Sequence, residues 1–543
     1  MNNRATIIPR MTQTFALIAA LVLSISVLYA VDASPEKPNI VVIYTDDQGY
    51  GDMSALDPES KCQTPNMDRI AQEGMIFTEG HSAAAVCSPS RYALLTGRYA
   101  WRTSMKSGVL GSDGPCLIAQ DRITLASLLK AKGYQTAIVG KWHLNMEFPG
   151  TRGERDWSKP ITDGPTEHGF DYYFGIPASM NFGVLTFVEN TRVLDVPSMW
   201  THKKKDKPSE SFRFMPPYDS EPKSKGDIEI APSFRDDLCL GTLTEKAVDY
   251  INSHVESAKA GQPFFLYFAM TSPHLPLCPA PEFIGKSQVG RYGDFMLETD
   301  HRVGQILAAL DKNGLAENTL VVFSSDNGST GVRGRLNKYG HASSGGFKGQ
   351  KQDIYEGGHH VPFLMRWPGV IQPGRTCDET VCQVDLFATV ADIVGAKLPT
   401  NAGEDSYSLL AALRGEEYPH PLRGPLVNHS GGGYFAIRDG QWKLDFVLGA
   451  GTIGAKPVKS KPGEPPFELY NMKDDWRETT NVYGQYPEVV TRLEGLATKT
   501  VMDGRSTPGV AQKNDGEPFW PQLTWIPEAA ALPKTKEKRN NEE

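Results

Sequence analysis

Four short apolar segments, each followed closely by polar residues, constrain this 543-residue sequence more than any other feature. They cover residues 39–45, 136–139, 264–269 and 320–323. Short continuous runs of aliphatic and aromatic residues are typical of strands that are buried on both faces of a parallel sheet. The four segments therefore predict such a sheet, with other elements covering both of its faces.

Amphipathic stretches between these segments predict the covering helices. One helix is expected to begin at Thr64-Pro65, where a capping residue precedes a proline, and to end at Gly74. Three more are expected over residues 123–132, 243–255 and 295–313. Alternating strands and helices predict an α/β fold, in which a large mixed, mostly parallel sheet is covered by helices on both faces.

The N-terminus has the composition of a secretory signal peptide. Arg4 and Arg10 precede an uncharged apolar run over residues 15–30, and the small residue Ala33 lies just beyond it. The run is short for a membrane span, so residues 1–33 are assigned to a signal peptide rather than to the alternative, a single membrane anchor. We therefore expect a secreted or periplasmic protein without stable membrane association.

Two domains are expected after the signal peptide. The first covers residues 34–424 and contains a charged, proline-containing excursion loop at 203–227. The second covers residues 425–533 and carries the hairpin signal Asp439-Gly440, which predicts a smaller α+β subdomain built on an antiparallel sheet. Residues 534–543 are strongly charged and predict a disordered tail.

Charge and cysteine content restrict the possible partners. The formal net charge is -8, so no global basic surface favours nucleic acid. The seven cysteines have none of the spacings of a zinc site. Their odd number leaves one thiol to explain in an exported protein, and a local Cys377–Cys382 pairing stays open.

The polar residues that follow the four segments form a candidate site. Ligands of open α/β sheets bind beyond the carboxyl ends of the strands, so these side chains are expected to meet in one crevice. They are Asp46, Asp47, Lys141, His143, His274, Asp326 and Asn327. Each alone is typical of a helix cap, a surface turn or a solvated charge, but their joint position favours a functional site. The carboxylates and the amide form an all-oxygen set suited to Ca²⁺, with Mg²⁺ as second choice.

A motif between the first two segments points to a known family. Cys87-Ser88-Pro89-Ser90-Arg91 is followed by Leu94-Leu95-Thr96-Gly97-Arg98. This pattern resembles the signature of the formylglycine-dependent (type I) sulfatases of the alkaline phosphatase superfamily. Further stretches resemble the family's motifs in the family's order, at residues 46–47, 140–143, 272–274, 326–328, 351–358, 438–443 and 468–471. Lys348 and His359-His360 depart from the family's usual arginines and could alter the shape of the crevice.

The resemblance implies a role for each site residue. Cys87 would be oxidised to formylglycine, whose hydrated gem-diol form attacks sulfur. Arg91, Lys141 and Lys351 would hold the diol and sulfate oxygens. His143 would take a proton from the second hydroxyl during collapse, and His274 would protonate the leaving oxygen. The divalent ion would bind the following residues, the last through its diol oxygen: Asp46, Asp47, Asp326, Asn327 and Cys87.

Together these features predict an arylsulfatase-like enzyme that hydrolyses sulfate esters to an alcohol and inorganic sulfate. The expected substrate is a sulfated carbohydrate or an aryl sulfate, and a formylglycine-generating enzyme is the expected maturation partner. Two alternatives stay open: a phosphodiester or phosphonate monoester hydrolase of the same superfamily, and a non-catalytic sulfoglycan-binding protein. Other histidines could line the substrate pocket, namely His168, His341, His359 and His360.

Overall fold

The computed structural model describes Met1 and residues 37–205, 211–456, 458–530 and 532. The predicted signal peptide beyond Met1 and the predicted tail at 534–543 lie outside the described residues. From residue 38 onward, the described residues form one compact unit. The predicted domain boundary after residue 424 therefore stays a prediction, although a second sheet does begin at Leu426.

Within the described residues, ten strands form one sheet in the order β15-β2-β14-β13-β1-β12-β3-β4-β6-β7. The four predicted segments are its central strands: β1 (Asn39–Asp46), β3 (Gln135–Lys141), β12 (Phe264–Pro273) and β13 (Thr319–Ser325). They run parallel to one another, and Val41 of β1 pairs with Leu266 of β12 on one side and with Val321 of β13 on the other. Their carboxyl ends therefore meet at one edge of the sheet.

The outer strands were not predicted, because they are shorter or less apolar. They are β2 (Met75–His81), β4 (Tyr172–Ile176), β6 (Val188–Glu189), β7 (Arg192–Val193), β14 (Phe363–Arg366) and β15 (Arg375–Cys382). β2 pairs parallel with β15, whereas β14 pairs antiparallel with both β13 and β2. The sheet is thus mixed and mostly parallel, as predicted.

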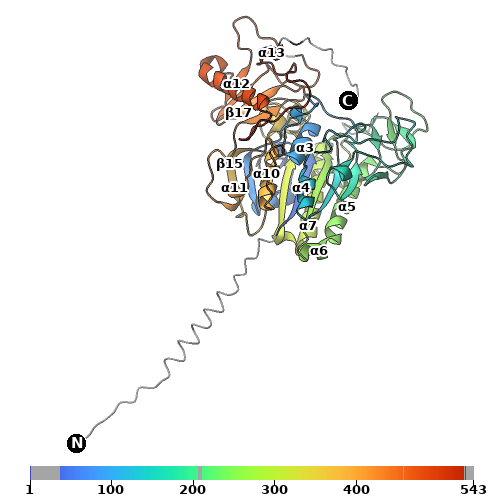
Figure 1. Ribbon diagram of the computed structural model, residues 1–543. Helices are drawn as coiled ribbons and strands as arrows, with labels where there is room; N and C mark the ends of the chain where they lie inside the picture. Colours follow the sequence, from blue (N-terminus) through green and yellow to red (C-terminus); the bar gives the residue numbers. More distant parts are fainter. Residues whose placement is uncertain (2–36, 206–210, 457, 531, 533–543) are drawn as a thin grey trace. The chain divides into compact units, whose positions relative to one another are not determined.

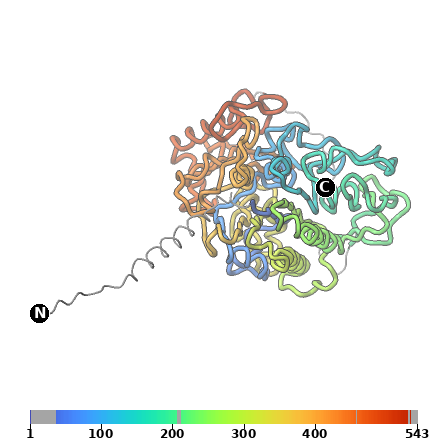
Figure 2. Tube along the Cα trace, turned by 60° about the horizontal axis from the view of Figure 1, so that its bottom comes forward, coloured from blue at the N-terminus to red at the C-terminus, as the bar shows by residue number. Residues whose placement is uncertain are grey.

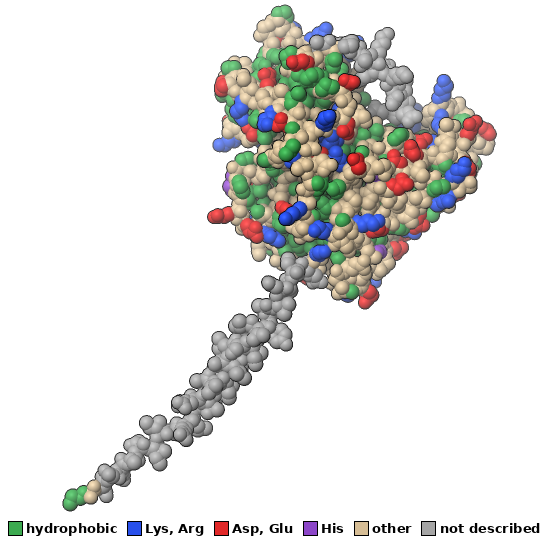
Figure 3. Space-filling model, viewed as in Figure 1, with side chains coloured by type: hydrophobic (Ala, Val, Ile, Leu, Met, Phe, Trp, Pro, Cys, Tyr) green, Lys and Arg blue, Asp and Glu red, His purple; other side chains and the backbone are tan. Residues whose placement is uncertain are grey.

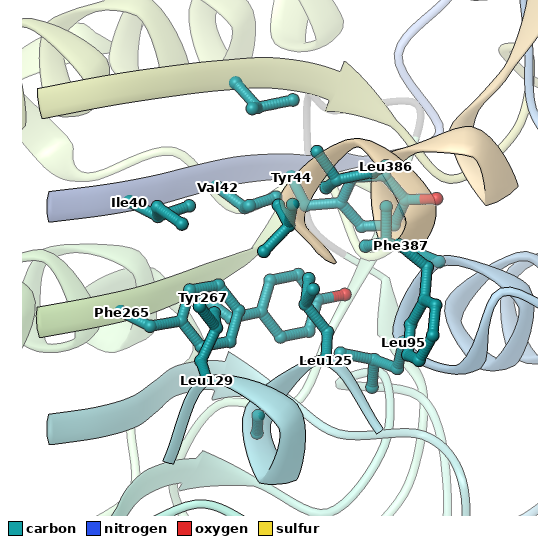
Figure 4. Packing of buried hydrophobic residues seen from close by; sticks show 14 of the residues in the cluster. Ile40, Val42, Tyr44, Leu95, Leu125, Leu129, Phe265, Tyr267, Leu386 and Phe387 are labelled. Carbon is teal, nitrogen blue, oxygen red and sulfur yellow. The ribbon is translucent and has the colours of Figure 1, made fainter. Parts of the chain in front are cut away.

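Helices cover both faces of the sheet. Successive side chains of a strand point to opposite sides, so an apolar strand presents apolar side chains on both faces. Ile40, Val42 and Tyr44 of β1 belong to one apolar layer, shown in Figure 4. The helices of that layer are α3 (Cys87–Thr96), α4 (Leu125–Ala131) and α10 (Leu386–Ile393). Val41 and Ile43 belong to the opposite layer. Its helices are α2 (Pro65–Gln72), α5 (Cys239–Ser253) and α7 (Gly290–Lys312).

The predicted helices are present, but two of them begin earlier than expected. α5 starts four residues before the predicted Leu243, and α7 starts at Gly290 rather than at Phe295. The first turns of both contain glycine, which contributes no hydrophobic signal to a helical period.

The C-terminal region forms a second sheet. Its antiparallel strands are β16 (Leu426–His429), β17 (Phe435–Asp439), β18 (Trp442–Asp445) and β19 (Glu468–Asn471). The predicted hairpin at Asp439-Gly440 joins β17 to β18, and α12 (Pro487–Met502) packs on both strands. Trp101 is fully buried between the two regions and packs edge-on against Phe435. This sheet is the orange to red part of Figure 2.

Most of the described part of the predicted excursion loop at 203–227 has no regular structure, and only Lys204–Lys205 and Phe212–Arg213 form strands there. These two strands belong to a set of short strands in this region of the chain. The set includes β5 (Val184–Leu185), β8 (Met199–Thr201), β9 (Lys204–Lys205), β10 (Phe212–Arg213) and β11 (Ile228–Ile230). These teal to green segments lie on a different side of the central sheet from the C-terminal sheet (Figures 1 and 2).

On the face shown in Figure 3, basic and acidic side chains are interspersed. None of the helices in the described residues combines the length and the apolar character that a membrane span requires.

Candidate active site

The carboxyl ends of β1 and β13 bring three aspartates together. Asp46 ends β1, Asp47 follows with a left-handed backbone (φ 68°), and Asp326 comes directly after β13. The Asp47 amide donates a hydrogen bond to Asp326 Oδ1 at 3.1 Å, and all three side chains are buried. Positive φ is costly for a residue with a side chain and is typical of functional sites. The backbone therefore holds a strained turn that makes the carboxylates converge.

Each of these aspartates has one cation as its nearest partner, and Arg91 also lies 3.8 Å from Asp46. The pairs and their shortest N···O distances are Lys141–Asp46 (2.8 Å), Lys351–Asp47 (2.8 Å) and Arg91–Asp326 (2.7 Å). We call these six residues the strand-end cluster. Its formal charges cancel, which makes the burial of five of these side chains, and of most of the Lys351 side chain, tolerable.

The carboxyl groups of the strand-end cluster differ in their titration. Burial raises the pKa of Asp46, but the charges of Lys141, His274 and Arg91 together outweigh it, so the pKa is lowered. At Asp47 burial acts in the same way, and Lys351 and His274 together lower the pKa. At Asp326, burial and the nearby charge of Asp46 dominate, so its pKa is raised. An additional positive charge at this point would favour the ionised form of Asp326.

Asn327 provides the observation that best fits a metal ion. Its Nδ2 donates to Asp47 Oδ1 at 2.8 Å and to the Gly328 carbonyl at 2.9 Å. Its Oδ1 is buried and accepts no hydrogen bond from any residue that the structure describes. A buried polar oxygen of this kind needs an ion or water as partner. With the three carboxylates it completes an oxygen-rich donor set that suits Ca²⁺ or Mg²⁺.

Cys87 begins α3, and Arg91 follows one helical turn later on the same face. Burial raises the pKa of the Cys87 thiol, although Lys141 and Lys351 oppose the effect. Because only a thiolate is strongly nucleophilic, an unmodified cysteine at this position would react poorly.

Two histidines each have one ring nitrogen fixed by a backbone carbonyl. His143 Nε2 donates to Leu110 at 2.8 Å, and its Nδ1 is buried without a partner in the described part of the chain. His274 Nδ1 donates to Leu275 at 2.6 Å, and its Nε2 lies 3.7 Å from Asp47 Oδ2. Burial lowers the pKa of both rings, and neighbouring lysines add to the effect. Each ring therefore keeps one nitrogen available to take up a proton.

The segment that carries Lys351 is tied to the turn after β13. The Lys351 amide donates to the Ser329 carbonyl at 2.9 Å. Gly328 approaches the same segment so closely that a Cβ there would lie 1.9 Å from the Gly357 carbonyl oxygen. Only glycine permits this approach. The positions of Asn327 and Lys351 are thus mechanically coupled.

A cavity of about 240 Å³ opens on these residues and is lined by Asp47, Cys87, His274 and Lys351. His143 stands behind one wall, with its ring centroid 5.1 Å from that of Phe182. Every predicted site residue therefore lies in the cavity wall or in the buried cluster behind it. Further lining residues were missed by the sequence analysis because they carry no motif or periodic signal, and they include Asn181, Phe182, Lys203, Phe212 and Ile453. Gln352, which belongs to the motif stretch 351–358, also lines the cavity.

Lys348, His359 and His360, which were expected to alter the crevice, do not line the cavity. Lys348 Nζ donates to Tyr470 Oη at 3.1 Å and so braces the C-terminal sheet. His359 and His360 are buried beside Glu356, away from the cavity lining. The other two histidines considered for the pocket, His168 and His341, also do not line it and instead bond to Asp163 and Asp52.

Glu356 belongs to a second buried group of charges, which joins the C-terminal sheet to the large sheet. Lys443 Nζ donates to Glu478 Oε1 at 2.7 Å, to Glu356 Oε1 at 3.0 Å and to the Ile354 carbonyl at 3.1 Å. We call Lys443, Glu356, Glu478 and His359 the Lys443 cluster. It explains why the Glu-Gly-Gly motif is present without lining the cavity.

Comparison with known proteins agrees with this geometry. A family model described as sulfatase matches residues 38–396, and one described as N-sulphoglucosamine sulphohydrolase, C-terminal, matches residues 346–447. The N-acetylgalactosamine-6-O-sulfatase of Bacteroides thetaiotaomicron is 34% identical, covering 85% of this chain and 92% of its own length. Human arylsulfatase A is 31% identical, covering 89% of this chain and 92% of its own.

A solved structure from work on glycosaminoglycan metabolism by Bacteroides thetaiotaomicron superposes with a TM-score of 0.72 at 32% identity. The match covers 86% of this chain and 99% of that one. These relatives favour sulfate ester hydrolysis over both alternatives, phosphodiester or phosphonate hydrolysis and mere sulfoglycan binding. The chain is therefore a sulfuric ester hydrolase and belongs to the sulfatase family.

Proposed function

We propose that this sulfatase removes 6-O-sulfate from an N-acetylgalactosamine-containing glycan, with a formylglycine made from Cys87 as its nucleophile. Sulfatases generally use a metal ion and formylglycine. The observation that carries the proposal is the position of Cys87, which begins α3 and shares one cavity with Asp47, His274 and Lys351. Its raised thiol pKa argues against direct attack by sulfur. A hydrated aldehyde at the same place would offer an oxygen nucleophile instead.

We assign Ca²⁺, with Mg²⁺ as second choice, to Asp46, Asp47, Asp326 and Asn327, together with the oxygen derived from Cys87. A divalent ion there would act as Lewis acid and template for a sulfate oxygen. The unpartnered Asn327 Oδ1 and the raised pKa of Asp326 support a cation at this place. Hard oxygen donors favour these two ions over zinc.

The remaining residues have two proposed roles, which are stabilising the negative charge of the sulfate and transferring protons. Arg91, Lys141 and Lys351 keep the sulfate oxygens in a field of positive charge, which matters most in a buried site. His274 would hold a proton at Nε2 and donate it to the leaving oxygen. His143 would accept a proton at Nδ1 from the hydrated Cys87 side chain. Histidine suits both tasks because its pKa can be brought close to neutrality.

The substrate proposal follows from the relatives. The Bacteroides relative is named an N-acetylgalactosamine-6-O-sulfatase, and canine and murine relatives named N-acetylgalactosamine-6-sulfatases are also 34% identical. The cavity is consistent with a sugar, because it combines two phenylalanines with several neutral polar side chains.

We also infer export and maturation from the sequence. The signal-peptide pattern at residues 1–33 supports a secreted or periplasmic protein. The intact Cys87-x-Pro89-x-Arg91 pattern supports recognition by a formylglycine-generating enzyme.

Sulfate release by enzyme made with and without a maturing enzyme tests the proposal. The substrates are 6-sulfated and 4-sulfated N-acetylgalactosamine, nitrophenyl sulfate and bis(nitrophenyl) phosphate. We expect turnover of the 6-sulfated sugar only when mass spectrometry finds an aldehyde at position 87. Activity with a wholly unmodified Cys87 would refute the nucleophile, and preferred turnover of the 4-sulfated sugar would refute the proposed substrate.

A further inference from the structure

Lys203 is the one charged residue lining the cavity that stands outside the strand-end cluster and the proton-transferring histidines. The other charged lining residues, Asp47 and Lys351, neutralise each other at 2.8 Å. Lys203 has no carboxylate partner among the residues that the structure describes. As far as the described residues go, the cavity therefore carries one positive charge without a carboxylate partner, in addition to the groups proposed for the chemistry.

Lys203 stands beside an aromatic surface. Its Nζ lies 4.9 Å from the ring centroid of Phe212, which also lines the cavity. Phe182 lines the cavity too and packs against His143. Apolar rings can hold the C–H face of a sugar, while a few polar groups fix its orientation. A cation next to such a ring is suited to an acidic substituent on the bound sugar or on its neighbour.

We propose that Lys203 is a specificity-determining residue that binds a second anionic group of the substrate, a carboxylate or a second sulfate. The proposal rests on the function proposed above and narrows its substrate to an acidic glycan with at least one anionic group besides the sulfate that is cleaved. An aryl sulfate or a neutral monosulfated sugar would leave Lys203 without a partner. A lysine, as a compact point charge, can serve either anion, whereas the bidentate geometry of arginine would favour planar partners.

The cations of the strand-end cluster are not free to bind the second anionic group of the substrate. Its three cations are held at 2.7–2.8 Å by Asp46, Asp47 and Asp326, at the end of the cavity where the sulfate is expected. A second anion on the same substrate must therefore find its partner elsewhere in the lining. Because Lys203 is exposed, its contribution is expected to be modest and sensitive to salt.

The test compares Lys203→Ala with Lys205→Ala, a matched exposed lysine two residues along that does not line the cavity. Four 6-sulfated probes are used: the neutral monosaccharide, a disaccharide with a uronic acid, the methyl ester of that disaccharide, and a disulfated monosaccharide. Lys203→Ala should raise KM about 3- to 10-fold on the acidic probes, with kcat unchanged and with no effect on the neutral ones. Lys203→Arg should retain most of the affinity, and Lys205→Ala should change nothing.

The four probes also separate the possible outcomes. An effect on the free acid but not on the disulfated sugar identifies a carboxylate, and the reverse identifies a sulfate. An equal change of KM on all four probes, or no change on any, overturns the role of Lys203. Wild-type enzyme that hydrolyses none of the 6-sulfated probes refutes the proposed function instead, so the two failures are distinguishable.

Discussion

The strand-end cluster and the Lys443 cluster both combine carboxylates with lysine in the interior of the protein, but only the strand-end cluster borders the cavity. In the Lys443 cluster, the three N–H donors of Lys443 reach Glu478, Glu356 and the Ile354 carbonyl. In the strand-end cluster, the neighbouring Asn327 Oδ1 accepts nothing from the described residues, and Asp47 and Lys351 border a cavity.

This difference indicates whether a buried group of charges has a structural role or binds a ligand. When the donors and acceptors of a buried cluster bond to one another, the cluster contributes mainly to the stability of the folded protein. A cluster with an orphaned oxygen beside a cavity is completed only by something that enters from outside. Substitutions in the strand-end region should therefore change activity more than stability, and substitutions in the Lys443 cluster should do the reverse.

The largest expected effect is that of Cys87→Ala, which removes the proposed nucleophile. We expect kcat to fall by roughly 10⁴–10⁶-fold, as for other lost nucleophiles, while thermal unfolding stays close to that of the wild type. The control is Cys239→Ala, which removes an equally buried thiol from α5 and should keep the activity of the folded enzyme. Substantial hydrolysis by the Cys87 variant would contradict the assignment.

His274→Ala should be selective for the leaving group. A sugar alkoxide needs a proton as the S–O bond breaks, whereas a nitrophenolate leaves without one. We expect a loss of about 10²–10⁴-fold on a sugar sulfate and a much smaller loss on nitrophenyl sulfate. His143→Ala should affect both substrates alike where its proton transfer limits the rate. Equal losses for His274→Ala across leaving groups of different basicity, with chemistry limiting, would remove it from the acid role.

Lys443→Met should lower stability and leave kcat nearly unchanged, whereas Cys87→Ala should lower kcat and leave stability nearly unchanged. The Lys443→Met substitution leaves Glu356 and Glu478 buried without their cation, which typically costs about 3–5 kcal/mol of the free energy of unfolding. The kcat of the molecules that remain folded should change only a few-fold. Urea denaturation combined with active-site titration measures both quantities. Lys473→Met, in an exposed lysine after β19, is the control and should cost little. A large fall in kcat with unchanged stability would contradict the structural role of the Lys443 cluster.

Calcium should distinguish the two clusters by binding to only one of them. At a free concentration 100 times its Kd, a ligand that binds only the folded state adds about 2.7 kcal/mol to the free energy of unfolding. We expect this gain in the wild type and in Lys443→Met, and its loss in Asp326→Asn, as measured by thermal unfolding with Ca²⁺ or with chelator. A gain that survives in Asp326→Asn would place the ion elsewhere.

The smallest expected effect concerns pH. Burial, with the charge of Lys443, lowers the pKa of His359 to about 3. Below about pH 6.5 the unfolded chain binds a proton at this histidine, but the folded protein does not until about pH 3, so stability falls as the pH falls through this window. At pH 5 the loss is about 2 kcal/mol relative to pH 7. His359→Gln should remove this part of the pH dependence in urea titrations at the two pH values. An unchanged slope would mean that the folded protein does protonate His359.

The sequence predicted the positions of the buried charged residues at the strand ends better than it predicted their surroundings. Asp46, Lys141 and Asp326 could be placed because strand ends in a parallel sheet must meet at one edge. The cavity wall around Lys203 and Phe212 could not, because short strands with little apolar periodicity are positioned by tertiary contacts.

His359 illustrates the opposite error. It lies close to Lys351 in the sequence, but the short helix α9 (Glu356–His359) turns it into the Lys443 cluster. His359, which was considered for the substrate pocket, therefore lies outside the cavity lining.

The burial of Cys87 restricts the time at which its proposed oxidation can take place. In the folded protein its side chain is only 1% exposed, and every residue of α3 is buried with it. The oxidation proposed for Cys87 requires a maturing enzyme to reach this side chain, and the finished helix leaves it buried. The proposed oxidation would therefore precede folding, during or soon after synthesis or export. A molecule that folded before this step would keep the thiol at position 87.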